Sequence, residues 1–195
     1  MATLKFIREV KDSHLLLLGV AEEGESAHYT VNAAAFEDVG SPSVGDELDG
    51  EQMSVIRYTD EYIRAKKKAL SILAFADNNQ KNLSAKLYRA GFEREIISEV
   101  LSEMVALGYI DERRQLERII LSEANGKLRG PRRIIPALIT KGFSSTDVSD
   151  VMHRLVDSGE IDFSKNARLL LDKKLPGCTD TEEKKKFLYK NGYKV

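Results

Sequence analysis

The residues of this chain that are best suited to bind a partner are basic, and many of them lie in one short segment. The interval from Ala124 to Lys141 contains five lysines or arginines and no acidic residue. Clustered guanidinium and ammonium groups bind carboxylates and nucleic-acid phosphates. With the arginines of the preceding helical pattern, the candidate partner- or DNA-binding residues are Arg113, Arg114, Arg118, Lys127, Arg129, Arg132, Arg133 and Lys141. A solvated helical face is the ordinary alternative for any one of these runs.

The other side chains that could perform chemistry show no catalytic or metal-binding spacing. The three histidines are scattered along the chain, at His14, His28 and His153. Cys178 stands alone, and no glycine-rich phosphate loop or nucleophile elbow is present. We interpret Glu22-Glu23 as a solvated turn and Asp111-Glu112 as a helix start, where negative charge suits the helix dipole. The sequence therefore predicts a protein without catalytic residues, metal or cofactor, and not an enzyme.

The charges are unevenly distributed along the 195 residues, although the net charge is only −1. Residues 1–60 hold 4 basic and 12 acidic residues, a net of −8, which leaves 26 basic and 19 acidic residues, a net of +7. The basic body is the part suited to an anionic partner. The single cysteine and the absence of a signal-peptide layout or a membrane-spanning run predict a cytoplasmic protein.

The elements that carry the basic residues belong to an internal repeat. The segment Leu87–Phe92 recurs as Leu138–Phe143 and again as Leu188–Tyr193, with a period near 50 residues. A helical apolar stripe follows the first two copies and closes at Gly108–Asp111 and Gly159–Asp162. Three helical patterns in each period predict tandem three-helix repeats, which bury their apolar stripes by stacking.

The basic segment contains a helix whose start and end are both marked. Gly130 followed by Pro131 predicts the start, since proline is tolerated at the first helical position. Gly142 predicts the end by supplying a left-handed residue, after which Phe143 folds back onto the last turn. An apolar stripe is expected between them from Ile134, Ile135, Leu138 and Ile139.

The fold class expected from these patterns is mainly α, with tandem three-helix repeats that form an elongated curved body and a small N-terminal α+β module. The module is expected to contain strands at 4–11, 14–21 and 27–31 and a short helix at 33–38. First helices of the repeats are expected at 65–75, 113–124 and 165–174. The predicted division is an acidic module at 1–56 and repeats at 57–111, 112–162 and 163–195, the third lacking its last helix.

These residues resemble the RecX family of bacterial regulatory proteins. The resemblance covers most of residues 60–193 and is carried by Gly108–Glu112, Gly130–Ile134, Leu138 and Lys141–Phe143. Val44–Leu48 and Asp60-Glu61 are similar to the N-terminal extension of some members. The chain departs from the family pattern at Leu116, where an aromatic residue often follows the paired acids.

The resemblance implies a non-enzymatic protein that binds the RecA recombinase filament in its helical groove. Members of the family inhibit ATP hydrolysis, DNA strand exchange and the co-protease activity of that filament. A basic repeat body suits such a partner, because several weak contacts along one groove act as a multivalent interaction. Two alternatives remain open: a general nucleic-acid-binding helical repeat protein, and a scaffold that uses its acidic module to hold another protein.

Overall fold

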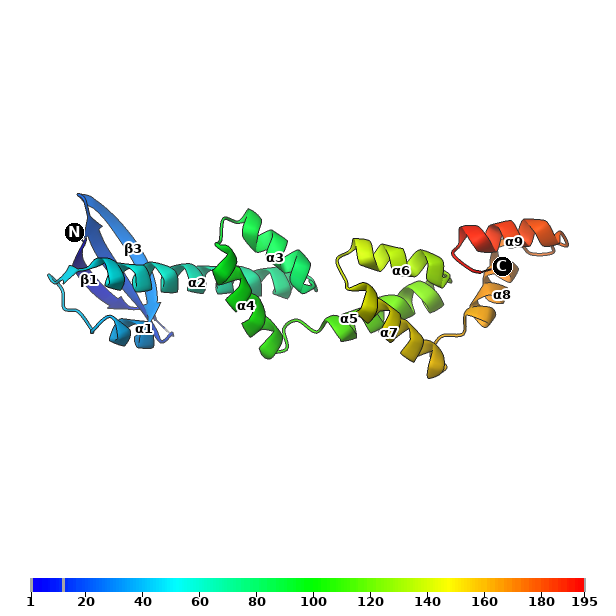
Figure 1. The fold of residues 1–195 in the computed structure, drawn as a ribbon, viewed down its shortest axis with the longest axis horizontal. Helices are drawn as coiled ribbons and strands as arrows, with labels where there is room; N and C mark the ends of the chain where they lie inside the picture. The colour runs from blue at the N-terminus through cyan, green and yellow to red at the C-terminus, as the bar shows by residue number, and fades with distance from the viewer. Residues whose placement is uncertain (1, 12, 195) are drawn as a thin grey trace. The chain divides into compact units, whose positions relative to one another are not determined.

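The computed structural model describes residues 2–11 and 13–194, which form two compact units. The first unit comprises residues 2–11, 13–76 and 83–106, and the second comprises residues 77–82 and 107–194. In chain order (Figure 1), the elements are β1 (Ala2–Glu9), β2 (Leu15–Glu22), β3 (Glu25–Asn32), α1 (Ala33–Asp38), β4 (Glu47–Leu48), α2 (Gly50–Phe75), α3 (Gln80–Arg89), α4 (Arg94–Ala106), α5 (Glu112–Leu121), a π-helical turn η1 (Ser122–Gly126), α6 (Pro131–Thr140), α7 (Ser145–Asp157), α8 (Phe163–Lys174) and α9 (Thr181–Lys190).

The N-terminal module is an antiparallel sheet that packs against α1 and α2. Its strand order is β3-β2-β1-β4, and Ile7, Leu18 and Tyr29 lie across from one another in the three long strands. Alternate residues are apolar in β1 and β3, β2 is apolar from Leu15 to Leu18, and one face of the sheet is buried. Leu4 and Leu18 on that face belong to the same core as the α2 residues Met53 and Ile56. The predicted α+β module is therefore confirmed.

Helix α2 runs without interruption from this module into the first three-helix repeat. A reciprocal capping box between Asp49 and Gln52 starts the helix. Farther along α2, Tyr62 Oη donates to Glu103 Oε2 of α4 at 2.5 Å, and Lys66 Nζ donates to Glu103 Oε1 at 2.6 Å. Helical character was expected from near Asp49 and the first helix of the repeat at 65–75; the structure joins both in α2, whose N-terminal half packs on the sheet of the same unit.

The second unit contains α5 to α9, and α5, α6 and α7 share a core of mostly aliphatic side chains. Leu116 and Ile120 of α5 and Ile134 and Leu138 of α6 are almost fully buried there. The expected start of α6 at Gly130-Pro131 is confirmed, and Gly142 has a φ of 98° after its end. Ile139 was wrongly assigned to the buried stripe: its side chain is exposed on the solvent side of α6.

The structure confirms the mainly helical fold class, with three-helix repeats after a small strand module. The exact division of the chain into four parts remains a proposal, and its first boundary at residue 56 falls within α2. No helix among the described residues is both long and apolar enough to cross a membrane.

Candidate partner-binding surface

Helix α5 places its three arginines on the surface by burying the opposite face. The side chain of Asp111 caps its first turn and accepts from Arg114 N at 2.9 Å. Leu116 and Ile120, four residues apart, fill the core of the second unit. All three arginines are exposed: Arg113, Arg114 and Arg118.

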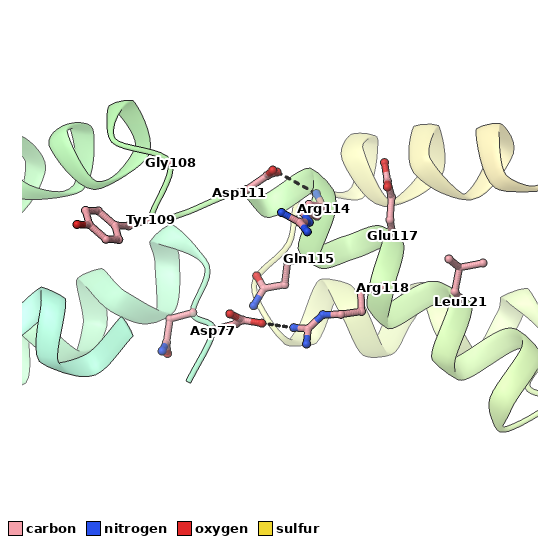
Figure 2. Close-up of a pocket in the computed structure, with 10 residues that line it drawn as sticks. Asp77, Gly108, Tyr109, Asp111, Arg114, Gln115, Glu117, Arg118 and Leu121 are labelled. Carbon is pink, nitrogen blue, oxygen red and sulfur yellow. Dashed lines mark hydrogen bonds and ion pairs between the residues drawn. The ribbon is translucent and has the colours of Figure 1, made fainter. Parts of the chain in front are cut away.

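Two of these arginines line a hollow of about 550 Å³ within the second unit. Figure 2 shows Arg118 reaching Asp77, with which it forms an ion pair, while Arg114 lies beside the cap residue Asp111. The hollow also contains Glu117, which pairs with Arg154 of α7. Asp77 therefore neutralises Arg118 in this hollow, whereas the Arg114 guanidinium has no acidic partner among the described residues.

Arg113 lies on a different side of α5. It lines a smaller hollow of about 250 Å³ together with Asp147 and Asp150 of α7. The three α5 arginines thus do not form one continuous positive patch.

Lys127 and Arg129 both bind one carboxylate within the second unit. Lys127 Nζ donates to Glu123 Oε1 at 2.6 Å, and Arg129 Nη1 pairs with Glu123 Oε2. Burial of Glu123 opposes its ionisation, but the hydrogen bonds from both cations outweigh this and lower the pKa of Glu123 below its ordinary value. The backbone returns through Leu128, whose φ is 52°. These two cations brace the loop before α6.

Arg132 and Arg133 flank the start of α6, and both are exposed. The nearby backbone donors are already used, however: Gly130 N donates to Asn191 O at 2.8 Å, and Arg132 N donates to Gly192 O at 3.1 Å. We call this contact between residues 130–133 and 191–193 the Gly130 joint. A phosphate at this helix start would have to displace those carbonyls, so only the arginine side chains are available to a partner.

Lys141 follows the other end of α6, about 15 Å away for a ten-residue helix. Its carbonyl accepts from Asn79 Nδ2 at 3.0 Å and from Asn82 Nδ2 at 3.2 Å. We call this contact between residues 79–82 and 141–142 the Asn79 joint. Lys141 is exposed, and its side chain lies apart from the arginines at the helix start.

The eight candidate residues therefore divide into three pairs and two separate positions. The pairs are Arg114 with Arg118, Lys127 with Arg129, and Arg132 with Arg133; Arg113 and Lys141 stand apart. Sequence reasoning missed four residues of the two joints: the side-chain amides of Asn79 and Asn82, the backbone carbonyl of Asn191 and the ring of Tyr193. The available signal was the recurrence of glycine at the same position of each repeat.

The Gly130 joint contains a buried aromatic residue. Tyr193 is 5% exposed, and its hydroxyl donates to Leu128 O at 3.0 Å. Burial raises the pKa of the Tyr193 phenol. The ring also meets Phe163 edge to face, with the two ring centroids 6.3 Å apart. The Arg132 and Arg133 pair is thus carried on a rigid support.

Within residues 2–11 and 13–194, no three His, Cys, Asp or Glu side chains gather where a metal could bind.

Comparison with known proteins identifies relatives that share one name, although no family model matches the chain. Regulatory protein RecX of Clostridioides difficile is 29% identical over 141 residues, which cover 72% of this chain and 65% of that protein. Regulatory protein RecX of Caldanaerobacter subterraneus is 27% identical over 177 residues, 89% of this chain and 85% of that protein. Regulatory protein RecX of Bacillus cytotoxicus is 25% identical, and the match spans 55% of its length.

Solved structures support the same fold. A crystal structure of regulatory protein RecX matches all of this chain and 95% of its own, with a TM-score of 0.72 and 20% identity. The crystal structure of RecX from Lactobacillus salivarius matches 70% of this chain and 90% of its own, with a TM-score of 0.59 and 19% identity. For several curated relatives, the match spans only about half to two thirds of their length.

Proposed function

We propose, from the premise that this chain belongs to the RecX family of regulatory proteins, that it binds the RecA recombinase filament in the cytoplasm and restrains it. The restrained activities are ATP hydrolysis, strand exchange and co-protease activity. The protein acts by occupancy of the filament and performs no chemistry of its own.

The observation that carries this proposal is the cationic surface of a repeat protein. A filament presents identical subunits, and a chain of repeats offers contacts to several of them at once, so weak contacts add through effective concentration. Among the described residues, five of the eight candidates have no ion-pair partner and remain available to an acidic partner: Arg113, Arg114, Arg132, Arg133 and Lys141.

ATP hydrolysis by RecA on single-stranded DNA tests the proposal directly. We expect inhibition at stoichiometric amounts of this protein. Replacing Arg132 and Arg133 by alanine should weaken inhibition several-fold, since each removes an exposed charge. Arg57→Ala is the control, because this exposed cation lies in the first unit, outside the candidate set, and already pairs with Glu22. Full hydrolysis in the presence of stoichiometric wild-type protein would contradict the proposal.

A second candidate function is general binding of nucleic acid without a recombinase partner, which the same arginines favour. It predicts tight binding to naked DNA with an affinity that falls steeply with salt. Substitution of Arg132 and Arg133 should then reduce both the affinity and the salt slope. A flat salt response would remove this candidate and leave the filament as the partner.

A further inference from the structure

A large apolar residue is exposed at the same position of all three repeats. Tyr88, Ile139 and Tyr189 each lie three residues before the glycine that follows the middle helix, and they are 59%, 42% and 64% exposed. The residues that precede two of them, Leu87 and Leu138, are buried, so packing in the core explains why those positions are apolar. Packing within the chain does not explain the exposed position, although apolar bulk recurs there in every copy.

These residues lie on helices that carry excess positive charge. Helix α3 has three basic residues and no acid, α6 has two and no acid, and α9 has four and two acids. The last helices have the opposite sign: α4 and α7 each have one arginine and three acids. The middle helices α3, α6 and α9 therefore have a net positive charge and the last helices a net negative one, while the first helices α5 and α8 are also net positive.

Basic groups also lie near the apolar residues, in space for Tyr88 and along the chain for the other two. The Arg94 guanidinium lies 5.8 Å from the centroid of the Tyr88 ring, which is a cation–π distance. Lys141 follows Ile139 by two positions, and Lys190 directly follows Tyr189. Each copy thus combines an exposed apolar side chain with a neighbouring cation.

The side chains at this position favour a protein partner over nucleic acid. Single-stranded nucleic acid binds proteins by stacking bases on aromatic rings. Isoleucine has no such ring, so the property shared by the three residues is apolar bulk. An apolar anchor inside a polar rim is the usual centre of a protein interface.

We propose that Tyr88, Ile139 and Tyr189 are anchor residues, each inserting into an apolar pocket rimmed by carboxylates on one subunit of the partner filament. The inference rests on the proposed function and adds a contact that the basic residues alone do not provide. The three anchors act as independent copies of one contact, and the flanking cations select pockets with acidic rims.

The test is a triple variant with Tyr88→Ser, Ile139→Ser and Tyr189→Ser. We expect its Kd for RecA filaments on single-stranded DNA, measured by fluorescence anisotropy, to rise by about tenfold or more, because truncated anchors dominate interface losses. The matched control is Val105→Ser with Val156→Ser. These valines are as exposed as Ile139, at 41% and 40%, but lie on the negative helices α4 and α7. Their Kd should change less than twofold.

Three outcomes separate the possibilities. If the wild-type protein binds no filament, the proposed function fails. If the wild type binds and the folded triple variant binds equally well, the anchors are overturned while the proposed function stands. If the triple variant loses affinity for naked single-stranded DNA in the same proportion, the residues contact nucleic acid and the anchor proposal is also overturned. Tyr88→Leu with Tyr189→Leu should retain filament binding, because it keeps the apolar bulk.

Discussion

The two ends of α6 meet their neighbours through equivalent residues that use different donors. At the Gly130 joint, the Asn191 carbonyl accepts from the backbone N–H of Gly130. At the Asn79 joint, the equivalent carbonyl of Lys141 accepts from the side chain of Asn79, which occupies the position of Gly130 in the first repeat. One contact is thus made by two backbones, and the other by a backbone and an amide.

This difference shows how a repeat can keep an interface while the residues that form it change. A glycine without a Cβ lets the two backbones approach until their own groups bond. An asparagine holds the chains farther apart and supplies the donor from its side chain, while its Oδ1 caps α3 through Asn82 N at 2.8 Å. The backbone version tolerates no added atom, whereas the amide version depends on one side chain.

Gly130→Ala should have the largest effect, because it forces apart the two backbones of the Gly130 joint. The Asn79 joint is left unchanged. A Cβ at this position would lie 2.3 Å from both the carbonyl carbon and the oxygen of Gly192, so the backbones must part. We expect a loss of about 2–4 kcal/mol in the free energy of unfolding measured in urea, together with faster hydrogen exchange at the Arg132 amide.

Gly126→Ala is the matched control for that variant. Gly126 lies in the same segment, but its nearest neighbour would be Ser122 Oγ at 4.0 Å, and its backbone is not left-handed. The alanine should be neutral or slightly stabilising. Equal stability losses in the two variants would contradict the backbone clash at the Gly130 joint.

Gly142 after α6 and Gly192 after α9 are a second pair of equivalent positions at which the two joints can be compared. Both have left-handed backbones, with φ of 98° at Gly142 and 90° at Gly192, so alanine costs about 1 kcal/mol at either. A Cβ at Gly192 would also lie 2.6 Å from the backbone nitrogen of Arg133, whereas at Gly142 the nearest atom is the flexible Lys81 Cδ at 3.0 Å. Gly192→Ala should therefore lower the unfolding free energy by about 1–2 kcal/mol more than Gly142→Ala.

Gly91→Ala measures the cost of a left-handed alanine without any steric clash. Gly91 is the equivalent residue of the first repeat, has a φ of 91°, and would bring its Cβ within 4 Å of nothing. Its loss should match the left-handed cost alone. If thermal unfolding gave the same loss for all three alanine variants, the two joints would not differ as their geometry indicates.

The sequence was sufficient to predict the local structure of α6 but not its neighbours. Gly130-Pro131 and Gly142 marked its ends correctly, because capping depends on adjacent residues. The same glycines also make close contacts that depend on which segments meet in space, and spacing along the chain does not specify these. The exposure of Ile139 was missed for a related reason: helical periodicity gives a face, but the width of the buried stripe depends on the packing helices.

The candidate basic residues were likewise identified by type but not by availability. The rule that clustered cations bind anions selected all eight positions equally. The structure shows Lys127 and Arg129 engaged by Glu123, which precedes the acid-free interval and was not counted with it. Lys127 is four residues from Glu123, a helical spacing that brings the two side chains together, but Arg129 reaches the same carboxylate only because the backbone turns back at Leu128. That turn has no strong signature in the sequence, since leucine rarely adopts a positive φ.

Glu123→Gln should have the smallest effect, and it tests whether this brace supports the Gly130 joint. The variant keeps the shape but removes the charge, and both cations are partly exposed, so we expect a loss of about 1 kcal/mol at pH 7. Because folding lowers the pKa of Glu123, the unfolded chain binds its proton first in acid. The stabilisation is therefore present above the ordinary pKa of 4.5 and is lost as the pH falls below it. Urea unfolding of wild type and variant should differ at pH 7 and converge as the pH falls through the lowered pKa of Glu123, and a constant difference would show that the charge of Glu123 is not the cause.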